Sequence, residues 1–363
     1  MECVFDVDRT SGEAHMDCIR CGLCNVCPVF RVERLESVSP RGKIIVSKSI
    51  DSRIARDFFK CSICGLCEVV CPMNLKLIEF WEKKREELFE KKLAPLPIHK
   101  KLREMTFRDF NPYGGKQEKR AEWLEFPVEK SRTLYFAGCT ASYKLQNMAK
   151  ASAMALKELG VEFTVLGPEE YCCGSPFLRT GQKDIGRFLF KKNIRAWQNA
   201  GVEVIITSCP GCYKTISQDY PRFARELGYS FEFEVKHISM IFSKLAKGKL
   251  GFKATYHDPC HLGRHMGMYE EPRDAIRRCG IKLVEMERNR EFALCCGAGG
   301  GLRSQFKEIS IAICEERVKE ALSTGTDILI TSCPFCEYNF IKTGKGRIKV
   351  FDLAEIVCMT LFP

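Results

Sequence analysis

The spacing of the cysteines constrains this chain more than any other feature. The chain has 363 residues, and 22 of them are cysteine. Two short stretches hold four cysteines each, the last one followed by proline: Cys18, Cys21, Cys24 and Cys27 in the first, and Cys61, Cys64, Cys67 and Cys71 in the second. The first residues are partly acidic and form no apolar run, so we expect no secretory signal. Thiols this close together in a protein that is not secreted favour metal ligation over a disulfide framework.

The second stretch, C-S-I-C-G-L-C-E-V-V-C-P, has the spacing of bacterial two-cluster ferredoxins. In that pattern three thiolates bind one cluster and the fourth binds the other. Zinc sites usually pair two C-x2-C motifs across a longer loop, so zinc fits poorly. We therefore predict two cubane [4Fe–4S] clusters. One is held by Cys18, Cys21, Cys24 and Cys71, and the other by Cys61, Cys64, Cys67 and Cys27.

The first stretch departs from this spacing at Cys27. Two residues separate Cys24 from Cys27, where the pattern has three. The missing residue shortens the reach of the chain by up to about 3.5 Å. Either the local turn is rebuilt, or the second cubane is more labile; Cys3 is a spare thiol that can substitute. Pro28 is retained after Cys27, which favours a rebuilt turn with Cys27 still a ligand.

From residue 131 onward the chain repeats itself. The segments 133–139 and 253–260 end in a cysteine, a C-C-G triplet follows each, and T-S-C-P-x-C closes each copy. Corresponding cysteines lie 121 residues apart (Cys139 and Cys260) to 124 residues apart (Cys209 and Cys333). Short apolar segments such as 161–167, 202–208 and 326–332 alternate with helical patterns near 183–199 and 304–323, which predicts parallel sheets covered on both faces. In such sheets ligands bind at the carboxyl ends of the strands, where these cysteines lie.

The expected fold class is therefore α+β multidomain. An N-terminal helical, two-cluster ferredoxin-like domain precedes two pseudo-repeated α/β domains with Rossmann-like parallel sheets. The expected boundaries are 1–80 for the ferredoxin-like domain, 81–130 for a helical linker, and 131–250 and 251–363 for the repeats. The linker begins with an apolar stripe at helical spacing that includes Leu77, Phe80, Trp81 and Leu88. This stripe fits a domain contact better than a membrane anchor.

Each repeat contributes five cysteines. We call Cys139, Cys172, Cys173, Cys209 and Cys212 the first set, and Cys260, Cys295, Cys296, Cys333 and Cys336 the second set. One zinc ion or one cubane uses four ligands, so five thiols suggest an extra iron or a bridging thiolate. Adjacent cysteines cannot easily share one tetrahedral ion, but they can bind neighbouring irons. Cys279, Cys314 and Cys358 lie in apolar helical contexts and are expected to be core residues.

The pattern C-x(n)-C-C-G-x(n)-C-P-x-C, present twice, resembles the catalytic subunits of heterodisulfide reductases. The whole order, ferredoxin motifs fused to two such domains, resembles the archaeal D type across nearly the entire chain, including H-D-P-C-H-L-G-R-H and C-C-G-A-G-G-G. The resemblance implies two noncubane [4Fe–4S] clusters, one at each set, facing each other across a cleft. It also implies reduction of a small-molecule mixed disulfide, that of coenzyme M and coenzyme B.

Some related subunits only transfer electrons. Iron–sulfur subunits of glycerol-3-phosphate, glycolate or lactate dehydrogenase complexes share the layout, and sulfur-metabolism homologues act on other disulfides or trisulfides. Many of the electron-transfer subunits lack cysteines of one set, whereas both are complete here, which favours disulfide chemistry. His261 and His265 are candidate proton donors to the product thiolates; alternatively they hold hydrogen bonds around a cluster.

The composition bears on partners and location. The chain carries a formal charge of +11, but thiolates bound to clusters offset part of it, so we expect no nucleic-acid partner. There is no flavin or haem-attachment motif, so the electron donor is expected on another chain: a membrane cytochrome b subunit or a soluble flavin and iron–sulfur complex. We expect a cytoplasmic protein attached to the inner face of the membrane through its partner. Four arginines are candidates for a basic rim that attracts an anionic substrate: Arg264, Arg273, Arg277 and Arg303.

Overall fold

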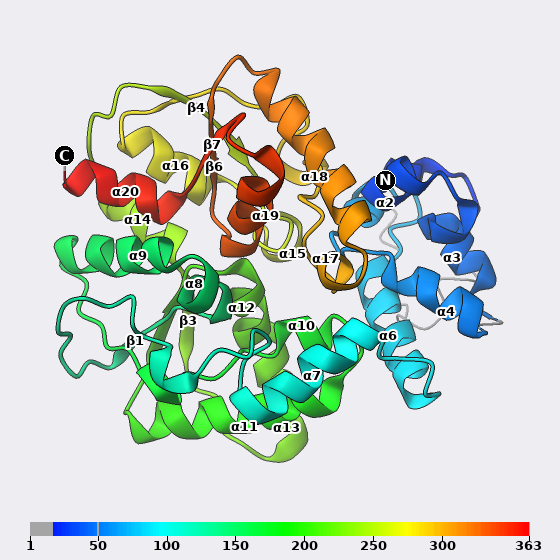
Figure 1. Cartoon of the computed structure of the whole chain (residues 1–363), viewed down its shortest axis with the longest axis horizontal. Helices are drawn as coiled ribbons and strands as arrows, with labels where there is room; N and C mark the ends of the chain where they lie inside the picture. Colours follow the sequence, from blue (N-terminus) through cyan, green and yellow to red (C-terminus); the bar gives the residue numbers. More distant parts are fainter. Residues whose placement is uncertain (1–16, 49–50, 363) are drawn as a thin grey trace, which may run out of the picture.

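The structure is a computed structural model that describes residues 17–48 and 51–362. Cys3 lies outside the described residues. The N-terminal part is entirely helical in these ranges and forms a separate lobe, blue in Figure 1. Its elements are η1 (Leu23–Val26), α2 (Pro28–Glu33), η2 (Glu36–Val38), α3 (Pro40–Val46), α4 (Ser52–Phe59) and α5 (Leu66–Val69).

Two longer helices connect this lobe to the repeats. They are α6 (Leu77–Glu90) and α7 (Pro97–Asp109), followed by the short η3 (Gln117–Lys119). The apolar stripe of α6 is buried at Leu77, Phe80, Trp81 and Leu88, and it belongs to the core of the N-terminal lobe. The stripe is thus a domain contact, as the sequence predicted. Helix α7 runs along α10 and α11 of the first repeat (Figure 1).

The first repeat is built on a three-stranded parallel sheet in the order β1-β2-β3. The strands are β1 (Thr133–Phe136), β2 (Val204–Thr207) and β3 (Glu234–His237). The helices are α8 (Cys139–Lys144), α9 (Gln146–Glu158), η4 (Gly167–Glu169), α10 (Ser175–Leu178), α11 (Lys183–Asn199), α12 (Pro210–Lys214), the π-helical η5 (Thr215–Asp219), α13 (Tyr220–Leu227) and α14 (Ile238–Leu245).

The second repeat has a four-stranded parallel sheet in the order β5-β4-β6-β7. The strands are β4 (Lys253–His257), β5 (Lys282–Leu283), β6 (Ile328–Thr331) and β7 (Lys349–Asp352). The helices are α15 (Gly263–Met266), α16 (Glu270–Arg278), η6 (Arg290–Phe292), α17 (Leu302–Gln305), α18 (Lys307–Leu322), α19 (Pro334–Gly344) and α20 (Leu353–Leu361). The predicted α/β repeat with parallel sheets is therefore confirmed.

Two details differ from the sequence prediction. The apolar segment 161–167 does not form a strand; it contributes a single bridge, between Thr164 and Leu134. The segment lies beside β1, and the opposite edge of the sheet is formed by β3, which pairs with β2 and which the hydrophobic pattern did not reveal. Strand β3 and its counterpart β7 each have one fully buried residue, at the carboxyl end, because each lies at a sheet edge. An edge strand carries a weaker hydrophobic signal than a central one.

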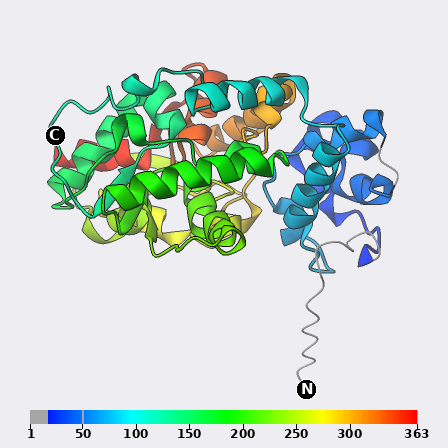
Figure 2. The same ribbon diagram turned by 90° about the horizontal axis from the view of Figure 1, so that it is seen from below.

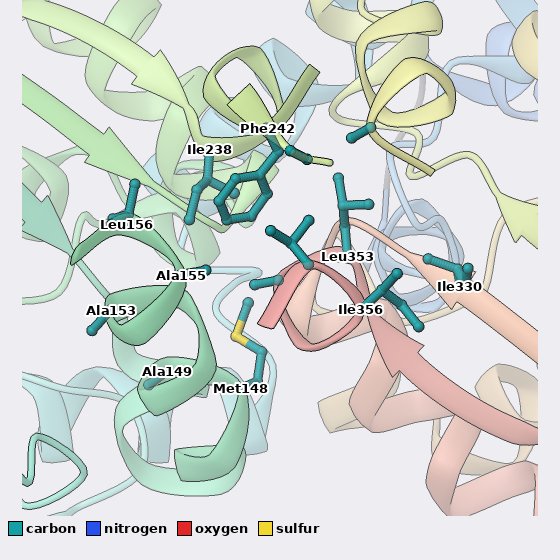
Figure 3. Packing of buried hydrophobic residues seen from close by; sticks show 14 of the residues in the cluster. Met148, Ala149, Ala153, Ala155, Leu156, Ile238, Phe242, Ile330, Leu353 and Ile356 are labelled. Atoms are coloured by element: carbon teal, nitrogen blue, oxygen red, sulfur yellow. The ribbon is translucent and has the colours of Figure 1, made fainter. Parts of the chain in front are cut away.

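The two repeats pack through α9 and α14 of the first and α16 and α20 of the second. Helix α20 of the second repeat lies on α9 of the first, and α14 of the first lies on α16 of the second. Figure 3 shows the joint core, in which Met148 and Leu156 face Phe242, Leu353 and Ile356. Small residues along α9 allow the helices to approach closely. The shared core fixes one sheet relative to the other, which decides where the cysteines of the two repeats meet.

A single buried arginine ties the N-terminal lobe to both repeats. The guanidinium of Arg85, on α6, donates to the carbonyls of Phe58 and Cys61 in the lobe (Nη2 to O, 2.9 and 2.8 Å). It also donates to the carbonyls of Arg179 and Gly300, one in each repeat (Nη1 to O, 2.6 and 2.9 Å). The side chain is fully buried. The lobe is visible beside the repeats in both views (Figures 1 and 2).

Within the described ranges, none of the helices is both long enough and apolar enough to cross a bilayer.

Candidate metal centres and the cavity between the repeats

The cysteines of the N-terminal lobe gather as two groups. Cys24 lies near Cys18 and Cys21, and burial followed by these neighbouring thiols raises its pKa to about 11. Cys67 lies near Cys64, Cys61 and Cys27 and is itself buried. Cys71 follows α5, and α5 packs on η1, which carries Cys24. Both arrangements agree with the predicted ligand sets.

The local turn at Cys27 compensates in part for its missing neighbour. Cys24 and Cys27 are joined by the 3₁₀ turn η1, in which the Cys27 amide donates to the Cys24 carbonyl (N to O, 3.0 Å). A 3₁₀ helix rises about 2.0 Å per residue and an α-helix about 1.5 Å. Three residues at the 3₁₀ rise span about 6 Å, which offsets part of the length lost with the missing residue. The sequence-based expectation of a rebuilt turn agrees with this geometry.

Cys27 is turned toward the other stretch. Burial raises its pKa to about 12; the Lys43 ammonium counteracts this and the thiols of Cys61 and Cys64 add to it. Lys43 is buried as well and donates to the carbonyl of Lys60 (Nζ to O, 2.8 Å). A buried cation thus stands beside the thiols predicted to hold the second cubane.

The two five-cysteine sets open onto one central cavity of about 330 Å³. The cysteines follow strand ends, as expected: Cys139 follows β1, Cys209 follows β2, Cys260 follows β4 and Cys333 follows β6. Nine cysteines line the cavity: Cys139, Cys172, Cys173, Cys209, Cys212, Cys260, Cys296, Cys333 and Cys336. The packing of α9 on α20 and of α14 on α16 turns the two strand-end edges toward each other.

Two thiols in each set have a lowered pKa because of hydrogen bonds with neighbouring thiols: Cys173 and Cys209 in the first set, and Cys295 and Cys296 in the second. Hydrogen bonds from Cys172 and Cys212 lower the pKa of Cys173 to about 6, against the effect of burial. In the second set hydrogen bonds with Cys295 and Cys336 lower the pKa of Cys296, whose sulfur lies 3.2 Å from that of Cys336. Cys173 and Cys296 occupy the same position in the repeat, the second cysteine of the C-C-G triplet. The thiolate form is the one that binds metal.

Cys295 does not line the cavity; its side chain contacts the N-terminal lobe. Its thiol is hydrogen-bonded to that of Cys64, and together with Cys260 and Leu294 the two form one buried cluster. A predicted cubane ligand and a second-set cysteine are thus in direct contact. The described residues give no corresponding contact between the lobe's cysteines and the first set.

The first set has a different neighbour, the buried ion pair of Arg120 and Glu170. Arg120 donates two N–H groups to the Cys139 sulfur (Nη1 and Nη2 to Sγ, 3.6 and 3.5 Å). The Glu170 carboxylate accepts from Arg120 (Nη2 to Oε1, 2.7 Å) and from the Gly138 amide (N to Oε1, 2.9 Å). The position equivalent to Glu170 in the second repeat is Ala293, 123 residues on as Cys295 is from Cys172. The two sets therefore differ in electrostatics although their ligands match.

The two candidate histidines are stacked, with ring centroids 4.2 Å apart. His261 lines the cavity, and its Nδ1 lies 3.4 Å from the Cys260 sulfur. His265 lies behind it, with its Nδ1 2.9 Å from the Lys214 ammonium. Burial lowers the pKa of both rings, with further lowering from nearby cations such as Lys214. Of the two histidines chosen from the sequence as candidate proton donors, His261 lines the cavity and His265 does not.

The cavity wall includes residues from segment 81–130, which sequence reasoning treated as a connection. His99 and Leu102 on α7 line it, and so does Tyr113, whose hydroxyl lies 3.0 Å from that of Thr140. Tyr338 of α19 lines it from the second repeat. No local motif marks these positions, because their role follows from where α7 packs.

The expected rim of four arginines is wrong. Arg273 is fully buried in an ion pair with Asp258 and Glu285, and Arg277 is exposed on α16 and pairs with Asp274. Arg264 lies at the junction with the lobe and does not line the cavity. Arg303 does line it, and it forms no ion pair with any residue that the structure describes. Of the four, Arg303 is therefore the cation that faces the cavity.

The remaining described cysteines lie apart from these groups or behind them. Cys279 and Cys314 are fully buried among apolar side chains, as expected of core residues. Cys358, on α20, is partly buried.

The donor sets fit iron–sulfur clusters. Each repeat offers five convergent thiols, and the described cysteines are free rather than paired as disulfides. His257, Cys296 and Cys336 place possible ligand atoms within 4.8 Å of one another, an arrangement able to hold metal. Soft thiolate sets of this kind select iron–sulfur clusters or zinc.

Comparison with known proteins agrees with this chemistry. Residues 14–75 match the 4Fe-4S dicluster domain, and residues 133–217 and 254–341 each match the cysteine-rich domain named CCG. Fold and site together define an iron–sulfur oxidoreductase in which a dicluster domain precedes two CCG domains. More particularly, the chain belongs to the family of the D-type subunits of heterodisulfide reductase.

This assignment rests on similarity over nearly the whole chain. The D-type subunit of the dihydromethanophenazine:CoB–CoM heterodisulfide reductase of Methanosarcina barkeri is 35% identical, over 95% of this chain and 93% of that protein. The EtfAB:quinone oxidoreductase of Syntrophomonas wolfei is 31% identical, over 89% of this chain and 48% of that protein. A crystal structure of a hypothetical protein from Helicobacter pylori has the same fold, with a TM-score of 0.61 and 10% identity over 99% of this chain and 74% of that one.

Proposed function

We propose that this chain is the iron–sulfur catalytic subunit of a complex that reduces a mixed disulfide of the coenzyme M–coenzyme B type. In this proposal each five-cysteine set holds a noncubane [4Fe–4S] cluster, and the N-terminal lobe holds two cubanes. The observation that carries it is that both sets are complete and that nine of their ten cysteines line the same cavity. An electron-transfer subunit needs a chain of centres, but it does not need two complete sets around a shared space.

The clusters would supply one-electron chemistry, and cleavage of one S–S bond needs two electrons and two protons. The protein supplies the position of the disulfide, which has to lie between the two sets. A cavity of about 330 Å³ that reaches both sets suits a small molecule with its S–S bond in the middle. Cys173 and Cys296, two thiols with lowered pKa, line the cavity from different repeats.

Arg303 is proposed to bind an anionic group of the substrate. It lines the cavity and is held by the Asn339 amide oxygen and by the Tyr338 ring, 5.2 Å from the ring centroid. Arg179 also lines the cavity, but it pairs with Glu82 and Asp219. A guanidinium that lines a cavity and is not paired with a carboxylate of the protein can bind a sulfonate, phosphate or carboxylate of a ligand through charge-assisted hydrogen bonds.

We propose that His261 makes the contact with the product thiolate and that His265 supports it from behind. His261 lines the cavity, whereas His265 is enclosed between His261 and Lys214.

We infer that electrons enter through the group of Cys18, Cys21, Cys24 and Cys71 and leave through the contact of Cys64 with Cys295. Cys21 is exposed, and the large apolar side chains of Ile19 and Leu23 beside it are 60% and 56% exposed. Such a patch around a redox centre suits docking of the electron donor. A membrane cytochrome b subunit and a soluble flavin-containing complex are the two donor classes, and a membrane-bound donor would attach the chain to the inner face of the membrane.

An anaerobic EPR experiment tests the proposed function. The iron-loaded chain is oxidised in the presence of coenzyme M, coenzyme B or uncharged ethanethiol, and iron is counted. Four clusters of the four-iron type predict about sixteen irons per chain. We expect a new paramagnetic signal with one of the two coenzymes, and not with ethanethiol.

The same experiment separates the two classes of function. If all clusters are present and reducible but no thiol changes the spectrum, disulfide reduction is refuted. The chain is then an electron-transfer subunit, as the partial similarity to a quinone oxidoreductase would suggest. A signal with an unrelated disulfide or trisulfide metabolite would keep the chemistry and change the substrate.

A further inference from the structure

Arg264 occupies the junction between the N-terminal lobe and the second repeat. It lies on α15, and its side chain donates to backbone carbonyls on both sides of the junction. Nε donates to the carbonyl of Cys64 in the lobe (2.6 Å). Nη1 donates to the carbonyls of Ala293 (2.7 Å) and Glu291 (3.0 Å) in the loop that leads to Cys295. One side chain thus holds the Cys64 loop against the Cys295 loop.

The charge of Arg264 is uncompensated. It forms no ion pair among residues 17–48 and 51–362, and its third nitrogen, Nη2, is buried without a hydrogen-bond partner. The thiols of Cys64, Cys260 and Cys295 all interact with it electrostatically. A buried donor left without an acceptor costs about 1–3 kcal/mol. The negatively charged sulfur atoms of a cluster bound by these cysteines would provide the acceptor that Nη2 lacks.

The first set differs at the corresponding place. Arg120 contacts Cys139, but Glu170 neutralises it within the same buried pair. The second set therefore carries a net positive charge from Arg264 where the first carries an ion pair. The difference lies on the side where the lobe delivers electrons.

We propose that Arg264 is a positioning residue that controls electron entry from the lobe into the second set. It does so by raising the reduction potential of the two centres that meet at the Cys64–Cys295 contact. Reduction adds negative charge to a cluster, so a nearby buried cation favours the reduced form, and hydrogen bonds to cluster sulfurs act in the same direction. The inference rests on the proposed clusters and not on the proposed disulfide substrate.

The test is an EPR-monitored redox titration of the iron-loaded chain with dithionite and mediators, without any disulfide. Signals are assigned by their loss in Cys64→Ala and Cys260→Ala variants. In Arg264→Met we expect the midpoint potentials of both assigned centres to fall by about 59 mV, a tenfold change in the one-electron equilibrium. The centres of the first set and of the Cys18 group keep their potentials. The matched control is Arg277→Met, which removes an exposed arginine of the same repeat, 51% exposed and paired with Asp274, and should shift nothing.

Two further variants keep the result interpretable. Arg264→Lys retains the charge and loses the planar fork, so its potentials should stay near those of the unmodified chain. If Arg264→Met binds less iron, Arg264→Gln is titrated in its place, because it keeps an N–H donor for the Cys64 carbonyl without the charge. Full iron with unchanged potentials in the neutral variant overturns the proposal, and so does an equal shift in Arg277→Met. Because no disulfide is present, neither result bears on disulfide reduction.

Discussion

Replacing Arg85 by methionine should loosen the N-terminal lobe from both repeats. The change keeps most of the apolar stem and removes a guanidinium that donates to four carbonyls: Phe58, Cys61, Arg179 and Gly300. Each carbonyl left unsatisfied in a buried site costs about 1–3 kcal/mol. The lower limit applies, because burying the charged guanidinium costs free energy that the methionine variant no longer loses. Four carbonyls at this limit give a destabilisation of about 4 kcal/mol.

Thermal unfolding of the iron-loaded chain measures this effect. A loss of about 4 kcal/mol lowers the Tm by about 8 °C or more, taking about 2 °C per kcal/mol for a large domain. Hydrogen exchange should accelerate at Phe58–Cys61 and around Gly300, because these segments lose their shared anchor. Arg85→Lys should fall between, since an ammonium cannot serve four acceptors in the geometry of a planar fork.

Arg108→Met is the matched control for Arg85. Arg108 is 72% exposed and pairs with the adjacent Asp109, so its loss should leave the Tm nearly unchanged. A Tm of Arg85→Met within 1–2 °C (roughly the scatter of a surface substitution) of the control, with unchanged exchange in both segments, would refute the reasoning. It would mean that other contacts, such as those of Arg264 with the Cys64 carbonyl and of Arg179 with Glu82, hold the lobe.

Three other outcomes are expected. Cys27→Ala should lower the iron content from about sixteen to about twelve per chain, whereas Cys279→Ala, which removes a buried thiol outside the two sets, should leave it unchanged in the same assay. Burial lowers the pKa of His99 to about 4. Its contribution to stability is therefore present above the unfolded pKa of about 6.5 and is lost as the pH falls from there toward 4. His99→Gln should therefore flatten the dependence of Tm on pH between 7.5 and 5.5. An unchanged slope would contradict this. Arg303→Ala should raise the KM for an anionic disulfide about tenfold or more with the iron content unchanged; a fall in kcat alone would instead argue against a role in substrate binding.

The predicted ligand groups needed little tertiary information. The ferredoxin spacing paired Cys61, Cys64 and Cys67 with Cys27, and the structure brings these thiols together. The short spacing from Cys24 to Cys27 put ligation of the second cubane by Cys27 in question, because the distance that the chain can span was judged from the number of residues. A 3₁₀ turn has a greater rise per residue than an α-helix, and this offsets part of the missing length.

The arginines were judged poorly from the sequence. Arg264, Arg273 and Arg303 look alike as single positive residues, yet one spans a junction, one is neutralised in the core and one faces the cavity. Which of these roles an arginine takes depends on whether carboxylates from distant segments pack beside it. Arg120 and Tyr113 received no attention because their segment carries no motif.

The sequence by itself determined the fold class and the repeat and predicted the cluster ligands, since these follow from local spacing and from the periodicity of apolar residues. Tertiary structure alone decided that both five-cysteine sets share one cavity, that Cys64 touches Cys295, and that Arg120 stands at Cys139. These contacts join residues that are far apart in the chain. They are fixed by how α9, α14, α16 and α20 pack and by how Arg85 holds the lobe, and no local pattern encodes the relative placement of packed units.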